Sequence, residues 1–438
     1  MPPPTRMRPD DFHFHALDIG PDPWTLSGTL PHIGNLRFYS MLPDLAGLAQ
    51  FGQDKKVPEI STSRIGFGED SDRNLLPIPI LSFGPKDAPA IVITGGIHAR
   101  EWISCEIAYL IAEYLLLNFT TEPSSNEFEK AIRYLVENRR IHVLPILNPC
   151  GHTYTIFSQD SGARLWRRNR RQLPLDGPSW VHALNHAPFT NVFTTAEVGF
   201  YKYNTVTYTI PGYPNPPAPP PPRGNKTYSF RVPPFGKNKP APQGIGADLN
   251  RNFPTAAWGQ WASETNFIPM PASDDYFGTD GASEPETKAI AAFLRSISDT
   301  LKATVDYHSY AQLTLYPSEA FNSGRVTEKY ERMGQVLSFQ TGYRLGTAPE
   351  LLGYDGIASL ADFASAFDGV RSFTIELDPS SAVDDGFTLP EDQIQMVFEK
   401  NILGALCLMA VAGGEPEAAL PFVSWNVTGR GNRLPLPE

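Results

Sequence analysis

The chain has 438 residues, 41% of them hydrophobic and 19% charged, so it can bury a large core. Its formal net charge of −11 argues against a general nucleic-acid binder, because nucleic acid attracts a basic surface. Three cysteines, Cys105, Cys150 and Cys407, are too few for a disulfide framework, and buried thiols are the simpler interpretation.

The two ends of the chain lack a regular hydrophobic pattern. Residues 1–34 are rich in Pro and Asp and predict an N-terminal arm, and residues 413–438 predict an irregular C-terminal tail. The intervening residues 35–412 form the predicted globular domain. The arm has no apolar signal segment, and the apolar stretch 402–411 is too short to span a bilayer. We therefore expect a cytoplasmic protein with no membrane partner, although secretion stays open.

In the first half of the domain, short apolar runs alternate with stretches of helical spacing. The predicted elements are a helix from about 38 to 49, strands at 60–65, 78–81 and 88–93, a helix ending near 117, a helix at 128–136 and a strand at 140–148. His142 lies inside the last of these strands and is predicted to be a hydrogen-bonded core residue rather than a ligand.

Two unusual stretches follow. Residues 164–171 form an Arg-rich run, whose usual meaning is a solvated loop. Residues 172–246 are dense in Pro, Gly and aromatic residues, and seven of the nine residues 214–222 are proline, which favours polyproline II. This long stretch is predicted to be an irregular insertion.

Order returns after residue 246. Ser283 and Glu286 have the spacing of a capping box, with Pro285 in the first turn of the helix that follows. The remaining predictions are strands at 303–310 and 370–377 and helices at 327–340 and 390–412. Strands that alternate with helices predict an α/β fold, with a mixed, largely parallel twisted sheet covered by helices on both faces.

Polar side chains lie at the ends of several of these strands. They are His98 with Glu101, Asn250 with Arg251, His308, and Glu376. Two imidazoles and one carboxylate are a common ligand set for catalytic zinc, with water in the fourth position. Each residue alone has a plainer interpretation, such as a surface His or a salt-bridged Glu. Four such groups at equivalent strand ends favour a functional site at the carboxyl edge of the sheet.

At this point the chain resembles the zinc metallocarboxypeptidases of the carboxypeptidase A type. The matching motifs occur in the family's order and cover roughly residues 35–412, which would be the catalytic domain. They are Gly-Ile-His98-Ala-Arg100-Glu101-Trp, Arg-Leu-Trp-Arg167, Asp-Leu-Asn250-Arg251-Asn, Asp-Tyr-His308-Ser-Tyr310-Ala-Gln and Phe-Thr-Ile-Glu376-Leu.

The resemblance implies a role for each matching residue. His98, Glu101 and His308 would hold one zinc ion per chain. Glu376 would be the general base, and Arg167 would stabilise the oxyanion. The substrate would be a peptide or N-acyl amino acid with a free C-terminal carboxylate, and its binding residues would be Asn250, Arg251, the mobile Tyr354, and, at the outer subsites, Arg100 and Tyr310.

The sequence departs from the family pattern in several places. The family's Asn-Pro-Asp-Gly turn carries Cys150 here, which we interpret as a turn residue. The 172–246 insertion lies between the Arg167 and Asn250 segments, so it is expected to lie near the cleft and restrict substrate size. Secreted relatives carry a long folded pro-segment, and about 35 residues cannot supply one. We therefore expect no zymogen activation.

Substrate preference depends on the pocket for the C-terminal side chain. Ala361 stands where basic-specific relatives place an acid, and a small apolar residue there favours neutral or hydrophobic C-terminal residues. Asp355 and Asp362 leave a basic preference open. Two alternative functions also stay open: a related zinc amidohydrolase acting on N-acyl amino acids, and a catalytically silent binding homologue.

Overall fold

The computed structural model describes most of the predicted globular domain. The described residues are 41–125, 127–158, 160, 162–173, 192–198, 201–210, 226–232, 245–258, 274–354, 356–381 and 386–414. The predicted N-terminal arm and nearly all of the C-terminal tail lie outside these residues, as does Asp355.

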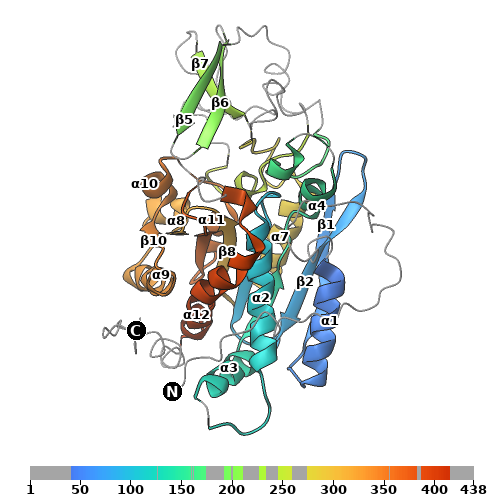
Figure 1. The fold of residues 1–438 in the computed structure, drawn as a ribbon. Helices are drawn as coiled ribbons and strands as arrows, with labels where there is room; N and C mark the ends of the chain where they lie inside the picture. Colours follow the sequence, from blue (N-terminus) through green and yellow to red (C-terminus); the bar gives the residue numbers. More distant parts are fainter. Residues whose placement is uncertain are drawn as a thin grey trace.

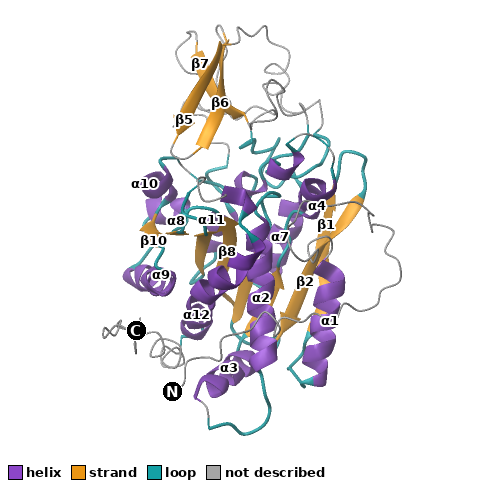
Figure 2. Ribbon diagram, viewed as in Figure 1, coloured by secondary structure: helices purple, strands orange, loops and turns teal. Residues whose placement is uncertain are grey.

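An eight-stranded sheet runs through the centre of the described domain (Figure 2). In chain order its strands are β1 (Ser61–Glu69), β2 (Leu75–Phe83), β3 (Ala90–Thr94), β4 (Arg140–Leu144), β8 (Leu301–Ser309), β9 (Leu313–Leu315), β10 (Arg344–Gly346) and β11 (Arg371–Leu377). Their spatial order is β1-β2-β4-β3-β8-β11-β9-β10. The central run β4-β3-β8-β11 is parallel, and so is β9 with β10, whereas the other pairs are antiparallel. The predicted mixed α/β sheet is confirmed.

Helices cover both faces of this sheet. They are α1 (Met41–Asp54), α2 (Trp102–Asn118), α3 (Glu127–Asn138), α4 (Pro149–Phe157), α7 (Pro285–Ser296), α8 (Ser318–Asn322), α9 (Glu328–Thr341), α10 (Ala348–Leu352), α11 (Leu360–Ser365) and α12 (Ile394–Ala412). Figure 1 shows α2 and α12 side by side in front of the sheet, with α1 and α3 near them. The helices α7 and α11 pack on the opposite face.

The core consists of two apolar layers because successive strand residues point to opposite faces. In β3, Ile91 and Ile93 join the layer under α2 and α12, while Val92 joins the layer under α7 and α11. The strand is buried on both faces, which explains its uninterrupted apolar sequence. Its carboxyl end therefore has a rigid support.

The insertion contains a sheet, so the prediction of an irregular segment was wrong. Strands β5 (Val192–Val198), β6 (Tyr201–Ile210) and β7 (Lys226–Val232) form a separate antiparallel sheet. It lies above α10 and α11 in Figure 1. Alternating β-branched and aromatic residues are the signal that the prolines of this region obscured. An isolated bridge between Gln172 and Ile245 pairs the two ends of the insertion.

Three local predictions were wrong. The strand predicted at 140–148 ends at Leu144, just before Pro145. Cys150 lies not in a turn but in the first turn of α4, where Asn148 caps the helix by accepting a hydrogen bond from the Gly151 N–H. The capping box at Ser283 does not form, because α7 begins one residue later with Glu284 at its N-cap.

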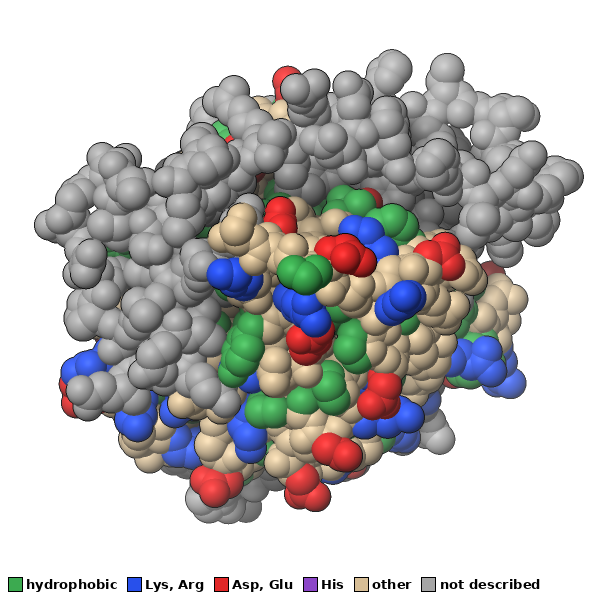
Figure 3. Space-filling model, turned by 90° about the horizontal axis from the view of Figure 1, so that it is seen from below, with side chains coloured by type: hydrophobic (Ala, Val, Ile, Leu, Met, Phe, Trp, Pro, Cys, Tyr) green, Lys and Arg blue, Asp and Glu red, His purple; other side chains and the backbone are tan. Residues whose placement is uncertain are grey.

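Other predictions from single residues are confirmed. His142 is buried, its Nδ1 lies 2.8 Å from the Ser82 hydroxyl, and burial lowers its pKa to about 3. The three cysteines are buried and free. Within the described residues, α12 alone is long and apolar enough to cross a membrane, but 67% of its apolar window is buried in the protein, as in an ordinary core helix. Seen from below, acidic and basic side chains are interspersed over the described surface (Figure 3).

Candidate metal centre and substrate recess

The loop between β3 and α2 brings His98 and Glu101 together. Gly96 has a φ of 64°, and a Cβ at Gly95 would come within 2.4 Å of the Ser104 carbonyl oxygen, so the loop requires this glycine pair. The Ser104 hydroxyl accepts from the Gly96 N–H and donates to the Glu101 carbonyl. In the loop held by these two hydrogen bonds, Nδ1 of His98 lies 2.8 Å from Oε1 of Glu101.

The third member, His308, comes from β8, more than 200 residues away in the chain. Its Nδ1 lies 3.0 Å from Oε2 of Glu101 and 3.1 Å from Nδ1 of His98. The ligand atoms of these three residues lie within 4.8 Å of one another, and all three side chains are buried. The structure therefore brings the three predicted metal ligands together.

Two outer carboxylates hold the imidazoles. Nε2 of His98 lies 3.1 Å from Asp248, and Nε2 of His308 lies 2.8 Å from Asp306. Neither acid is among the site residues predicted from the sequence. The signal was present, because Asp306 is two residues before His308 on one face of β8, and Asp248 is two residues before Asn250. Such partners fix the orientation and tautomer of a ligand histidine.

The donor set fits a zinc ion. Since a carboxylate only accepts hydrogen bonds, each Nε2 must donate, which leaves each Nδ1 to face Glu101 and the other Nδ1. Two protonated Nδ1 groups 3.1 Å apart would repel, whereas two lone pairs and a carboxylate around a divalent cation would not. Two neutral imidazoles and one carboxylate match a catalytic zinc site with an open position. Burial alone would raise the pKa of Glu101, but His98 and His308 lower it below its usual range.

Glu376 lies on the strand next to His308. In the parallel pairing of β8 and β11, these two residues are register partners. Burial raises the pKa of Glu376 to about 7; the negative charge of Glu101 adds to the rise, while His308 opposes it. A carboxylate with a pKa near neutrality can both take and return a proton.

Arg167 joins the centre through Asp248. Its Nε and Nη2 both lie 2.9 Å from Oδ2 of Asp248, and its Nη1 lies 3.7 Å from Oε1 of Glu101. Burial opposes both charges, but their attraction prevails, so the pKa of Asp248 is well below its usual range and that of Arg167 is well above. The Arg167 side chain is thereby held with one edge toward the metal centre.

The prediction of a solvated loop for the Arg-rich run was wrong. Arg168 is only 1% exposed, and its guanidinium lies over the Trp166 ring. Arg170 stacks on Tyr154 at 3.7 Å from the ring centroid, and Arg164 stacks on Trp102 at the same distance. Aromatic faces and backbone carbonyls replace water around these guanidinium groups. The run is therefore packed against the protein, and of its described residues only Arg167 lines the recess beside the metal centre.

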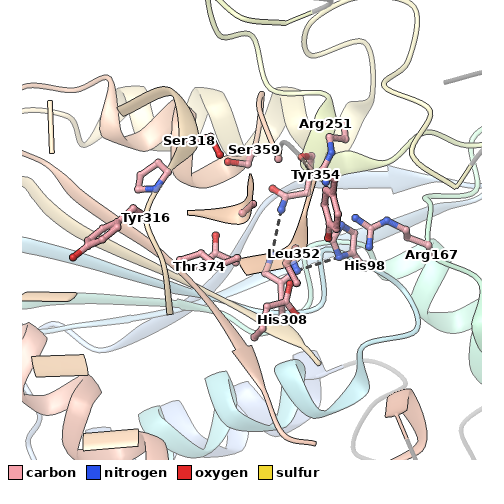
Figure 4. A pocket seen from close by; sticks show the side chains of 16 residues that line it. His98, Arg167, Arg251, His308, Tyr316, Ser318, Leu352, Tyr354, Ser359 and Thr374 are labelled. Carbon is pink, nitrogen blue, oxygen red and sulfur yellow. Dashed lines mark hydrogen bonds between the residues drawn. The ribbon is translucent and has the colours of Figure 1, made fainter. Parts of the chain in front are cut away.

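A recess of about 480 Å³, open mouth included, extends from the metal centre. Its lining residues are His98, Arg167, Asn250, Arg251, His308, Leu315, Tyr316, Pro317, Ser318, Ala348, Leu352, Tyr354, Gly356, Ser359, Thr374 and Glu376. Figure 4 shows Arg251, Tyr354 and Arg167 grouped on one side of the recess with His98 and His308 below them. The end of the recess away from the metal is lined by apolar and hydroxyl groups.

The Asn250–Arg251 pair sits on a single 3-10 turn, Leu249–Arg251, capped by the Asp248 side chain. Asn250 Oδ1 accepts from the Leu360 N–H, and Nη1 of Arg251 donates to the Asn250 carbonyl. One carboxylate, Asp248, thus supports both the metal centre and this turn.

Three predicted substrate residues lie outside the recess as described. Arg100 pairs with Asp274 at 3.0 Å, and its guanidinium lies 4.3 Å from the Phe387 ring centroid. Tyr310 contacts the same ring edge-on at 4.8 Å, so these two residues form a group with Phe387, which was not predicted from the sequence. Ala361 is buried in α11 at 2% exposure and does not line the recess.

Asp362, the acid next to Ala361, is held by hydrogen bonds within the protein. Asp362 accepts hydrogen bonds from the N–H and the hydroxyl of Ser359 and from the Glu319 N–H. Burial, with the negative charge of Glu319, raises its pKa to about 7. Asp362 therefore anchors the walls of the recess and is not among its lining residues.

Comparisons with known proteins place the chain in one family. The family model for zinc carboxypeptidases matches residues 51–198 and 226–404. Human carboxypeptidase O is 28% identical over 322 residues, covering 72% of this chain and 63% of that protein. Mouse carboxypeptidase A4 is 26% identical over 363 residues, covering 80% and 65%. The matches thus span somewhat less than two thirds of these relatives.

Solved structures show the same fold. Bovine thrombin-activatable fibrinolysis inhibitor, in complex with a tick carboxypeptidase inhibitor, has a TM-score of 0.54 at 21% identity, covering 88% of this chain and 98% of that one. Carboxypeptidase A from Helicoverpa armigera has a TM-score of 0.52 at 19% identity, covering 86% and 73%. With the family model matched over most of the described domain, the chain belongs to the zinc carboxypeptidase family.

Proposed function

We propose that this protein is an active zinc carboxypeptidase that removes a neutral or hydrophobic C-terminal residue from a peptide. The observation that carries the proposal is the placement of Arg251 in the recess that opens on the His98–Glu101–His308 centre. A guanidinium fork binds a carboxylate bidentately, so it can hold the end of a chain at a set distance from the metal.

Each side chain then has a task. Zinc, bound by His98, Glu101 and His308 with one ion per chain, supplies Lewis acidity toward the scissile carbonyl and toward water. Glu376 takes the proton of the attacking water and returns it to the leaving amine. Arg167 donates to the oxygen on which negative charge develops, which is worth about 3–4 kcal/mol for a well-aimed donor.

The remaining predicted residues bind substrate. Asn250 and Arg251 hold the terminal carboxylate, and Tyr354 closes over the substrate from the loop after α10. The Arg100–Tyr310–Phe387 group would contact residues farther from the scissile bond. The cytoplasmic location and the domain limits stay predictions.

The preference for a neutral C-terminal residue is supported by the recess itself. Its described lining beyond Arg251 carries no charged side chain; it comprises Leu315, Tyr316, Pro317, Ser318, Ala348, Leu352, Gly356, Ser359 and Thr374. The nearest acids behind it are occupied, since Glu319 accepts from Thr255 and from the Ala358 N–H, and Asp362 from Ser359. A charged substrate side chain would lose hydration without gaining a partner.

The test is a panel of N-blocked dipeptides that end in Leu, Phe, Lys or Asp, together with N-acyl amino acids, assayed with and without a chelator. We expect the Leu and Phe substrates to have the highest kcat/KM and all turnover to stop on chelation. Cleavage of the N-acyl amino acids alone would favour the amidohydrolase alternative, and binding without turnover would favour a silent homologue. Turnover that survives complete metal removal would contradict the proposal.

A further inference from the structure

A second buried polar cluster lies behind the metal centre, at Asn169. This side chain is 0% exposed, and every polar atom of the residue is used. Its Nδ2 donates to Oε2 of Glu284 and to Oε2 of Glu286, both at 2.9 Å. Its Oδ1 accepts from the Ala247 N–H at 2.8 Å, its own N–H donates to the Ala247 carbonyl, and its carbonyl accepts from the Trp166 indole.

These contacts join the two segments that carry the Arg167–Asp248 ion pair. Asn169 is two residues after Arg167, and Ala247 immediately precedes Asp248. The segments are cross-linked by one backbone hydrogen bond between residues 169 and 247 and by another from the Gly246 N–H to the Arg171 carbonyl. The amide of Asn169 adds the side-chain bond that fixes their spacing.

The two acids attach this junction to the start of α7. Glu284 and Glu286 are both 0% exposed, and two ionised carboxylates so close would repel strongly. Burial, with the negative charge of Glu284, raises the pKa of Glu286 to about 8, so Glu286 is largely protonated at neutral pH. Packing around it is tight, because a Cβ at Gly68 would come within 2.7 Å of Oε1 of Glu286. The acceptors of Asn169 are therefore rigidly placed.

We propose that Asn169, held by Glu284 and Glu286 at the start of α7, is a positioning residue that keeps the Arg167–Asp248 pair aligned with the metal centre. Asn169 touches neither substrate nor metal. It acts through Arg167, which faces Glu101, and through Asp248, which supports Nε2 of His98. The expected change in kcat rests on the proposed carboxypeptidase function, whereas the expected change in zinc release does not.

The principal variant is Asn169→Ala, with Asn401→Ala as its matched control. Asn401 is also a buried asparagine, with two hydrogen bonds from its Nδ2, but it lies on α12 on the other side of the sheet. Both variants are expected to lower Tm. Only Asn169→Ala should lower kcat on an N-blocked dipeptide and speed zinc release to a chelator, each by about tenfold or more, as expected when a ligand's supporting partner is loosened.

A second pair of variants tests the acid side of the cluster. Glu286→Gln keeps an oxygen that can accept from Asn169, and we expect kcat and zinc release within twofold of wild type. Glu286→Ala removes that oxygen and should move both quantities in the same direction as Asn169→Ala. This pair keeps the proposal testable if Asn169→Ala does not fold.

The outcomes separate the two claims. The positioning role is overturned if a folded Asn169→Ala protein keeps kcat and zinc release within twofold of wild type, or if Glu286→Gln is as impaired as Glu286→Ala. If the wild-type protein binds zinc but cleaves no peptide, the proposed function fails, while the zinc-release comparison still decides whether Asn169 positions the centre.

Discussion

Replacing Arg167 by Lys tests the geometry of the active site most directly. Arg167 uses Nε and Nη2 for Asp248, both at 2.9 Å, and thereby turns Nη1 toward Glu101 and the mouth of the metal centre. A lysine has one ammonium group in place of this planar fork. It can pair with Asp248 or reach the oxyanion, but it cannot do both in a fixed orientation.

The magnitude follows from the loss of one aimed donor. Such a donor contributes about 3–4 kcal/mol to the transition state, which corresponds to a decrease in kcat of roughly 10²–10³-fold. The KM should change by less than about threefold, because the carboxylate of the substrate is held by Arg251 on a separate turn. Zinc content should be unchanged, since the three ligands and their outer acids remain.

Arg167→Ala should in addition lower stability. Asp248 is 0% exposed, and Arg167 holds its pKa well below the usual 3.8. The ion pair therefore stabilises the folded protein above pH 3.8, and this stabilisation is lost as pH falls through the lowered pKa. Removing the arginine partner of this buried carboxylate costs on the order of 3–5 kcal/mol. Added guanidinium should restore part of kcat to this variant but none to Arg167→Lys.

The assay is hydrolysis of an N-blocked dipeptide at saturating and limiting substrate, with zinc measured on each preparation. Arg168→Lys is the matched control, because Arg168 is an adjacent buried arginine that lies over Trp166 and outside the recess. Its kcat should stay within about threefold of wild type. Arg167→Lys with full zinc and a kcat close to that of the control would refute the assigned role.

Four further changes test other parts of the structure. Glu376→Gln should keep zinc but lose most of kcat, and full activity in this variant would remove Glu376 from the mechanism. The wild-type rate should fall as pH drops below the pKa of Glu376, which is about 7 without metal and which the positive charge of bound zinc moves to lower pH. Because the folded-state pKa of Glu286 is about 8 against an ordinary 4.5, Glu286 should make wild-type stability fall as pH rises between these values, by on the order of a few kcal/mol at pH 8. In chemical denaturation Glu286→Gln should remove this share of the slope and leave the shares of Asp362 and Glu376; an unchanged slope would contradict the buried protonated acid. Gly413→Ala should cost about 1–3 kcal/mol, seen as a lower Tm, because the new Cβ would come within 2.2 Å of the Arg139 guanidinium that caps α12 through the Met409 and Ala410 carbonyls. Replacing residues 174–244 by a short turn should leave the rate on dipeptides unchanged, because the Gln172–Ile245 bridge remains, and should raise the rate on long peptides. If the variant and the wild type cleave long peptides as well as dipeptides at the same rates, the insertion does not restrict access.

The sequence was sufficient for the elements that its local pattern determines. The apolar run of β3, the glycines after it and the helical spacing of α2 place His98 and Glu101 at one strand end without any knowledge of the rest of the chain. The polar ends of β8 and β11 were recognisable for the same reason, since an apolar strand has no need of His308 or Glu376. These residues form the candidate metal centre and the proposed base beside it.

Local pattern failed where distant residues decide the environment. An arginine run has the composition of a solvated loop, and only the packing of Trp102 on Arg164 and of Tyr154 on Arg170, both from other segments, replaces water around it. The density of proline in the insertion hid its strands from the sequence pattern. These strands pair with one another and not with the main sheet.

What the sequence determined by itself was the set of candidate metal ligands and the fold that presents them, because strand burial and turn chemistry are encoded within a few neighbouring residues. Only the tertiary structure decided which acid supports which imidazole, which side chains line the recess, and that Asn169 joins two segments to α7. Those choices depend on the closing of long loops, because they bring together side chains that are 150 residues apart in the sequence, as His98 and Asp248 are, or 210 apart, as His98 and His308 are.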